Sequence, residues 1–270
     1  MEKNNHLACW EWFLLLFLGI IFGGFADFFA LTGNEISQSV FGFPALTIVT
    51  SALVLGLYAL YVKFVEKHEP TDLKLNKLIP HTLLGLLVGA IYMILVVCSI
   101  AASGCATVSM SDFSLKEQFG VIMLFLAVAV GEEIICRGII FRLIDQRWNT
   151  WAALIFSALF FGFGHISNDN ATCWSSIAIA IEAGLLLGAA YKWSGTLWVP
   201  IGIHWAWNYV QGNVFGLAVS GGDTGDAILA TTVNGPDIIT GGAFGPEASI
   251  IAVIFGILFT IVFLFNRYRH

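Results

Sequence analysis

The sequence predicts an all-α, polytopic membrane protein with about eight transmembrane helices. Of its 270 residues, 58% are hydrophobic and 11% are charged, whereas soluble domains carry about 25% charged residues. Several separate apolar stretches reach or approach the ~20 residues that a helix needs to cross the hydrocarbon core of a bilayer. These stretches continue to the C-terminus, so a single secretory signal cannot account for them.

The expected helices follow one another as apolar runs separated by short polar or charged segments. The first three and the last are nearly uninterrupted, and the fourth carries charged residues in its second half. The fifth and seventh are short, and Pro200 in the seventh predicts a kink because proline removes a backbone hydrogen bond. Short helices in membranes are tolerated where they face protein or a water-filled cavity. The expected ranges are 10–31, 41–65, 79–102, 119–141, 151–166, 175–193, 197–210 and 248–265.

The distribution of basic residues predicts that both chain ends are cytoplasmic, because positive charges favour the cytoplasmic side of a membrane. With eight helices, Lys116 alone falls outside, and Arg137 lies within a helix. We expect one membrane domain over residues 1–270. The lack of an organellar transit signal favours a bacterial plasma membrane, with the endoplasmic reticulum as the alternative. The lipid bilayer is one partner, and no basic run indicates nucleic acid. The basic residues placed inside are Lys3, Lys63, Lys67, Lys74, Lys77, Arg142, Arg147, Lys192, Arg267 and Arg269.

The segment 211–247 lies outside in this arrangement and contains no lysine or arginine. It is rich in glycine and has few apolar anchors before the last helix. We therefore expect a flexible loop, with a lid over an opening as the alternative.

Two adjacent carboxylates, Glu132 and Glu133, lie in the apolar run VIMLFLAVAVGEEIICRGIIF, and Arg137 follows Glu133 by one helical turn. An ionisable group at bilayer depth costs several kcal/mol by most scales, so it indicates a functional site by default. The alternative is that Glu133 and Arg137 form an ion pair that only fixes packing.

Further polar side chains occur at a similar depth in the neighbouring expected helices. Phe161 and His165 are four residues apart, as are His204 and Asn208, so each pair lies on one helix face. Each histidine alone is explained by a hydrogen bond between helices, but the whole set is too polar for that role. Two further acids are less informative: Asp27 is expected to be exposed or capped near an outer helix end, and the role of Glu182 stays open.

Such a set supports three kinds of chemistry. A glutamate can act as the general base that deprotonates water for attack on a peptide carbonyl, while histidine and asparagine N–H groups stabilise the oxyanion. Glutamate and histidine can instead hold a zinc ion that activates the water. Carboxylates and histidines also form relays for protons or cations.

Three motifs in order resemble the CPBP family, the CAAX proteases and bacteriocin-processing enzymes also called ABI proteins. GEEIICR matches the EExxxR signature, FFGFGH carries the FxxxH element and HWAWN carries the HxxxN element. The resemblance covers about 119–212 and implies an intramembrane endopeptidase of glutamate type or a metallo-endopeptidase. It implies that Glu132 activates water with His165, and that His204 and Asn208 stabilise the oxyanion. Glu133 would act with the catalytic residues, with Arg137 and Phe161 supporting them.

The resemblance implies no required cofactor, with a divalent metal such as zinc as the alternative, held by Glu132, His165 and His204. The implied partner is a peptide or protein substrate, membrane-associated or prenylated in some members. A membrane transporter or bacteriocin-immunity protein that uses the same polar cluster without cutting remains the rival hypothesis. The sequence leaves open the natural substrate and its lipidation, the metal dependence and the oligomeric state.

Overall fold

The predicted all-α architecture is confirmed in the computed structural model, which describes residues 8–41 and 45–266. In this part of the chain, two short strands, β1 (Ala106–Met110) and β2 (Leu229–Val233), accompany the helices. The helices are α1 (Cys9–Phe41), α2 (Ala45–Leu60), α3 (Leu75–Ala102), α4 (Leu115–Glu133), α5 (Arg142–Arg147), α6 (Thr150–Gly164), α7 (Cys173–Ile179), α8 (Leu185–Ser194), α9 (Trp198–Tyr209), α10 (Asp237–Thr240) and α11 (Ile250–Phe265).

Five helical stretches among the described residues are long and apolar enough to cross a membrane. A helix forms in each region where the sequence predicts one, but α6, α9 and α11 have 15, 12 and 16 residues. These are shorter than the ~20 residues of a full span, so the number of eight spans stays a prediction. The five long stretches are Cys9–Ile36, Leu46–Val65, Leu75–Ala102, Leu115–Arg147 and Cys173–Ser194.

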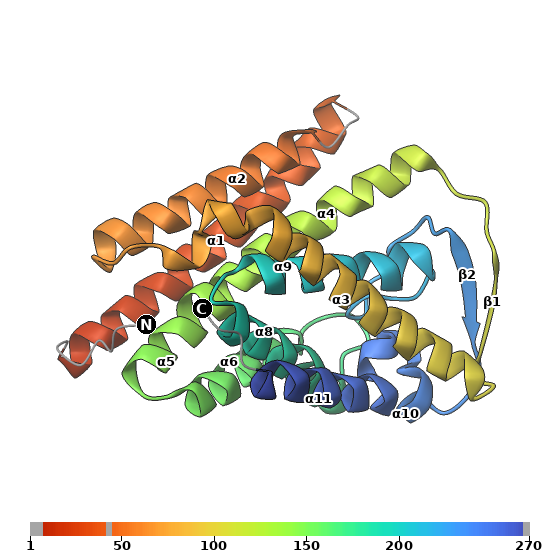
Figure 1. Cartoon of the computed structure of the whole chain (residues 1–270). Coiled ribbons are helices and arrows are strands. Elements are labelled where there is room, and N and C mark those ends of the chain that lie inside the picture. Colours follow the sequence, from red (N-terminus) through yellow and green to blue (C-terminus); the bar gives the residue numbers. More distant parts are fainter. Residues whose placement is uncertain (1–7, 42–44, 267–270) are drawn as a thin grey trace.

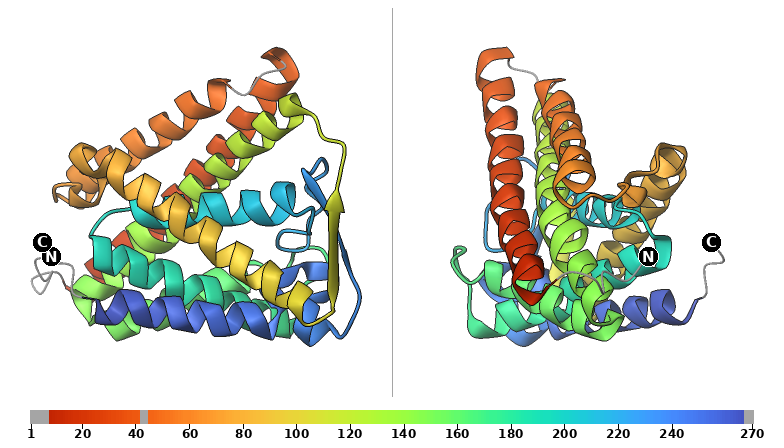
Figure 2. Two further views of the ribbon diagram at one scale, coloured as in Figure 1. Left: turned by 45° about the vertical axis from the view of Figure 1, so that its right-hand side comes forward. Right: turned by 90° about the vertical axis from the view of Figure 1, so that its left-hand side faces the viewer.

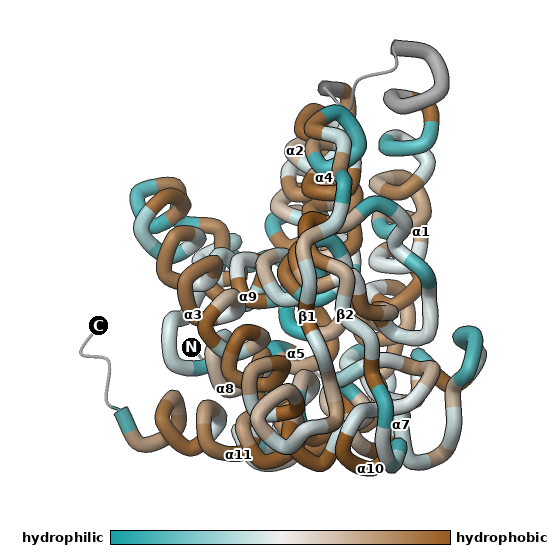
Figure 3. The backbone as a smooth tube through the Cα atoms, turned by 90° about the vertical axis from the view of Figure 1, so that its right-hand side faces the viewer, coloured by the Kyte–Doolittle hydropathy of each residue, from teal (hydrophilic) through white to brown (hydrophobic). Residues whose placement is uncertain are grey.

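Three of the long helices form one layer. α1, α2 and α4 contact one another and lie side by side in the views of Figures 1 and 2. The remaining helices pack beside this layer, and α9 occupies a central position because it contacts α3, α4 and α8. Figure 3 shows that the helices are mainly hydrophobic along their length and that hydrophilic colour gathers at ends and links.

Helices α3 and α9 approach closely because glycine lines their crossing. A Cβ atom on Gly85 or Gly89 of α3 would meet the backbone of α9, and one on Gly202 of α9 would meet the backbone of α3. Small residues permit this approach between membrane helices. The crossing fixes the position of α9, whose residues from Trp198 to Ile203 are buried.

The kink predicted at Pro200 is wrong. Helix α9 begins at Trp198, so Pro200 lies in its first turn. Backbone N–H groups in the first turn have no partner within the helix, so proline removes no hydrogen bond there.

The helix that carries the glutamates and two neighbours contain π-helical turns. Such turns run from Ile134 to Phe141 after α4, from Ala180 to Gly184 between α7 and α8, and from Val210 to Val214 after α9. They follow Glu133, include Glu182 and follow Asn208. A π-helical turn inside an α-helix is rare and occurs frequently at functional sites.

The segment after α9 is folded, in contrast to the flexible loop that its glycines predicted. Its strand β2 pairs antiparallel with β1, with Ala106 opposite Val233 and Met110 opposite Leu229, at one edge of the molecule (Figure 1). The backbone N–H of Ser220 donates to Glu247 at 2.7 Å, and the Trp174 indole donates to the Ala248 carbonyl at 2.7 Å. We call residues 215–249 the outer cap.

Candidate active site

The buried carboxylate of Glu133 is the centre of an ion-paired network. The guanidinium Nη1 of Arg137 donates to its Oε1 at 2.9 Å, and neither side chain is exposed to solvent. The Nη2 of Arg137 also donates to the carbonyls of Ala183 and Gly184 at 3.4 and 3.2 Å. A buried ion pair needs such additional hydrogen bonds to offset the loss of hydration.

Glu133 also orients His204. The Nδ1 of His204 lies 3.0 Å from the same Oε1, and its Nε2 lies 3.8 Å from Oε2 of Glu132. A carboxylate only accepts, so Nδ1 carries the proton in this hydrogen bond. The imidazole is thus held between the two adjacent glutamates, with Nε2 facing Glu132.

The two glutamates differ in exposure. Glu132 is 28% exposed, and Glu133 is fully buried. Oε2 of each glutamate is buried and has no hydrogen-bond partner among the described residues, but Oε1 of Glu133 is engaged by Arg137 and His204. Glu132 is therefore the member of the pair whose side chain is open to solvent.

Phe161 joins the network to the second histidine. Its ring centroid lies 4.6 Å from Cζ of Arg137, 5.0 Å from the ring of His165 and 5.8 Å from that of His204. The Nδ1 of His165 lies 2.8 Å from the Phe161 carbonyl, which can only accept a hydrogen bond. This bond places the proton on Nδ1 and leaves Nε2 of a neutral His165 as an acceptor.

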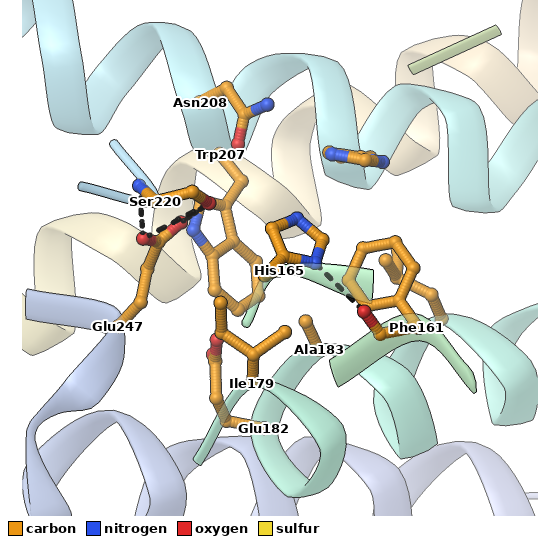
Figure 4. A pocket seen from close by; sticks show the side chains of 11 residues that line it. Phe161, His165, Ile179, Glu182, Ala183, Trp207, Asn208, Ser220 and Glu247 are labelled. Atoms are coloured by element: carbon orange, nitrogen blue, oxygen red, sulfur yellow. Dashed lines mark hydrogen bonds between the residues drawn. The ribbon is translucent and has the colours of Figure 1, made fainter. Parts of the chain in front are cut away.

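A pocket with an empty volume of about 280 Å³ lies beside this network (Figure 4). His165, His204 and Asn208 line it together, although they come from the end of α6 and from α9. Glu132 is not among the lining residues and meets this group through His204. The structure thus brings together the seven positions predicted from the motifs, which are Glu132, Glu133, Arg137, Phe161, His165, His204 and Asn208. The lining residues are Phe161, His165, Ile179, Glu182, Ala183, Leu187, His204, Trp207, Asn208, Ser220 and Glu247.

Two carboxylates in this pocket were not assigned a role from the sequence. Glu182 is fully buried and accepts a hydrogen bond of 2.7 Å from the Tyr92 hydroxyl. Glu247 of the outer cap is 3% exposed. Burial raises the pKa of the Glu247 carboxyl, against the lowering effects of the Ser220 hydrogen bond and of His165. The glycine-rich text around Glu247 gave no signal, because only the fold of the cap brings it to the pocket.

The expectation for Asp27 is wrong. Helix α1 continues to Phe41, so Asp27 lies in its middle rather than near its end. Its Oδ1 is buried without a hydrogen-bond donor among the described residues, and it would clash with any Cβ atom on Gly131. Asp27 is close enough to Glu132 and His204 to interact with both electrostatically.

The structure shows no preformed metal-ligand cluster: among the described residues, no group of three or more histidine, cysteine or acidic side chains is arranged to hold a metal ion. The Nδ1 atoms of His165 and His204 are engaged by Phe161 and Glu133, which leaves Nε2 as the nitrogen that would bind a metal ion. The zinc alternative, with Glu132, His165 and His204 as ligands, stays a prediction.

Comparison with known proteins agrees with the position of this network. Residues 115–210 match the family model described as type II CAAX prenyl endopeptidase Rce1-like. This description agrees with the resemblance of the three motifs to the CPBP family of CAAX proteases. The matched segment contains α4 to α9 and every residue of the glutamate, histidine and asparagine motifs, whereas α1 to α3 and the outer cap lie outside it. No curated protein matches the chain.

Proposed function

We propose that this membrane protein is an intramembrane endopeptidase that hydrolyses a peptide bond with water activated by Glu132. The observation that carries the proposal is the clamp on His204, which lies between the buried, Arg137-paired Glu133 and the partly exposed Glu132. The CPBP match over the same residues supports it independently. A clamp of this kind holds catalytic groups in place before the substrate binds.

In the proposed reaction, Glu132 takes a proton from water while the water oxygen forms a bond to the peptide carbonyl carbon. His165 accepts a hydrogen bond from this water through Nε2, because its Nδ1–H is fixed on the Phe161 carbonyl. Glu132 then returns the proton to the leaving nitrogen as the C–N bond breaks. One carboxylate therefore serves as base and then as acid.

The developing negative charge on the carbonyl oxygen would be stabilised by His204 and Asn208. Both residues line the pocket from one face of α9. Protonated His204 presents Nε2–H to this oxygen, and the buried Glu133 compensates the positive charge of the ring. Donors fixed by packing act strongly because they need no rearrangement during the reaction.

The proposed substrate is a peptide or protein that reaches the site within or beside the bilayer, including a prenylated one. We also propose that the chain lies in a bacterial plasma membrane with both ends in the cytoplasm. In this proposal the reaction needs no cofactor, because a carboxylate would activate the water.

Glu132→Gln tests the proposal directly. We expect the variant to fold and insert normally but to lose at least ~100-fold in peptide cleavage, the usual contribution of a general base. Cleavage would be measured with purified protein, a peptide library and mass spectrometry. Glu117→Gln is the matched control, because Glu117 is exposed in the first turn of α4 and loses the same charge.

Cleavage that persists in Glu132→Gln would contradict the proposed base. A wild-type protein that cleaves no peptide, yet carries protons or ions across vesicles in a Glu132-dependent manner, would favour the transport hypothesis.

Chelation separates the two ways of activating water. We expect protein treated with a strong chelator to keep its activity and to contain no zinc by elemental analysis. Loss of cleavage that zinc alone restores would instead show that a metal ion activates the water.

A further inference from the structure

The pocket beside the candidate active site has an acidic side that the reaction does not use. Glu182 reaches it from the π-helical turn between α7 and α8, and Glu247 reaches it from the outer cap. Figure 4 shows both side chains beside Trp207, on the side of the pocket away from Phe161.

The carboxylate of Glu182 is only partly satisfied. Its Oε2 accepts from Tyr92, but Oε1 is buried and has no hydrogen-bond donor among the described residues. The side chain is fully buried, and an unpaired polar atom in such a place is destabilising. Because Glu182 lies in the pocket wall, a donor group on a bound substrate could reach this oxygen.

Neither carboxylate has a basic side chain beside it. Within residues 8–41 and 45–266, no lysine or arginine forms an ion pair with Glu182 or Glu247. Glu247 is held by the Ser220 backbone N–H instead, and interacts electrostatically with His165 and His204. Two carboxylates beside one small pocket favour a positively charged occupant.

An aromatic surface completes the acidic side. Trp207 lines the pocket and stacks on Tyr92, with ring centroids 4.3 Å apart. The face of a tryptophan ring attracts a cation, and more strongly so where water is excluded. Carboxylates beside an aromatic face are a suitable environment for an ammonium or guanidinium group.

The pocket is small. Its empty volume of about 280 Å³ includes space that is open to solvent, so its enclosed part has room for the end of one side chain rather than for a whole small-molecule ligand. It also adjoins His204 and Asn208, the residues proposed to hold the reacting carbonyl. A side chain in this pocket would therefore belong to a residue next to the bond that is cut.

We propose that Glu182 and Glu247 form a specificity subsite for a basic side chain of the substrate, adjacent to the scissile bond. The proposal rests on the proposed endopeptidase function. The predicted preference for a basic side chain depends partly on Glu247. This residue lies beyond residue 210, outside the segment that matches the family model.

The experiment compares lysine with norleucine, which has a similar linear side chain without the charge. Peptides found to be cleaved by the full-length protein in detergent are remade with either residue at each position flanking the cut. At one position we expect the lysine peptide to be cleaved with a kcat/KM at least ~10-fold higher, as a buried charge pair allows. In Glu182→Gln and in Glu247→Gln the ratio of the two kcat/KM values should fall to ~3-fold or less.

Both substitutions keep an acceptor for Tyr92 or Ser220 and nearly the same volume, and the ratio is insensitive to a general loss of active protein. Glu117→Gln, which removes an exposed charge, should keep the wild-type ratio. Equal cleavage of the lysine and norleucine peptides at every position, or a preference unchanged in both variants, would overturn the subsite alone. A wild-type protein that cleaves no peptide would overturn the proposed function, and the subsite with it.

Discussion

At the scale of single residues, burial and partners distinguish two glutamates that are neighbours in the sequence. Glu133 is buried against Arg137 and holds His204, whereas the side chain of Glu132 is 28% exposed. The i, i+4 spacing of Glu133 and Arg137 predicts their contact. The spacing alone does not predict that this pair also orients a histidine from a helix about seventy residues later.

Arg137→Ala should strongly destabilise the protein. It leaves the charge of Glu133 buried without its partner, which typically costs about 3–5 kcal/mol. Lys63→Ala is the control, because both members of the Lys63–Glu69 pair are exposed, the lysine side chain by 54% and the glutamate side chain by 75%. Exposed pairs contribute about 0–1 kcal/mol. Thermal unfolding in detergent measures the stability of both variants. An equal decrease in unfolding temperature would contradict the larger contribution expected from the buried pair.

At the scale of helices, the crossing of α3 and α9 determines where His204 and Asn208 lie. Gly85, Gly89 and Gly202 let the two backbones approach closely. His204 and Asn208 both lie on the short helix α9, so a shift of this helix would move His204 away from Glu133. A closely packed crossing resists such a shift because packed interiors have few voids.

Gly89→Ala tests this crossing. The new methyl group would meet the backbone of Ile203, and overpacking of this kind costs about 1–3 kcal/mol. We expect a lower unfolding temperature and reduced cleavage, since His204 follows Ile203 directly. Gly56→Ala in α2 is the control, because nothing lies within 4 Å of the added Cβ. It should be neutral or stabilising by up to ~1 kcal/mol. A neutral Gly89→Ala would contradict the close crossing.

At the scale of the whole molecule, two interhelical ion pairs lie at one end, and the outer cap with Glu247 lies at the other. The ion pair of Arg142 with Glu66, 2.7 Å long, links the segment after α2 to the start of α5. Lys192 and Asp145 link α8 to α5 at the same end of the molecule. The outer cap lies at the other end of α9 and holds Glu247 over the pocket. This separation is consistent with the predicted orientation in the membrane.

The orientation can be measured with single cysteines in a background whose native cysteines are serine. Asp223→Cys lies in the outer cap, and Glu69→Cys lies between α2 and α3; both positions are exposed. A thiol reagent that cannot cross membranes should label Asp223→Cys in intact cells, and Glu69→Cys only after the cells are opened. The reverse labelling would contradict the distribution of basic residues as a guide to topology.

The sequence by itself determined the helical membrane class, the order of the helices and the seven positions that meet at the site. It could do so because hydrophobic run length and residue spacing along one helix are local properties. Only the tertiary structure decided that Asp27 faces Gly131, that Pro200 lies in the first turn of α9 and that the glycine-rich segment after α9 is folded. It also decided that Glu182 and Glu247 share a pocket with both histidines. These features depend on contacts between segments distant in the chain, and no local pattern records which segments will meet.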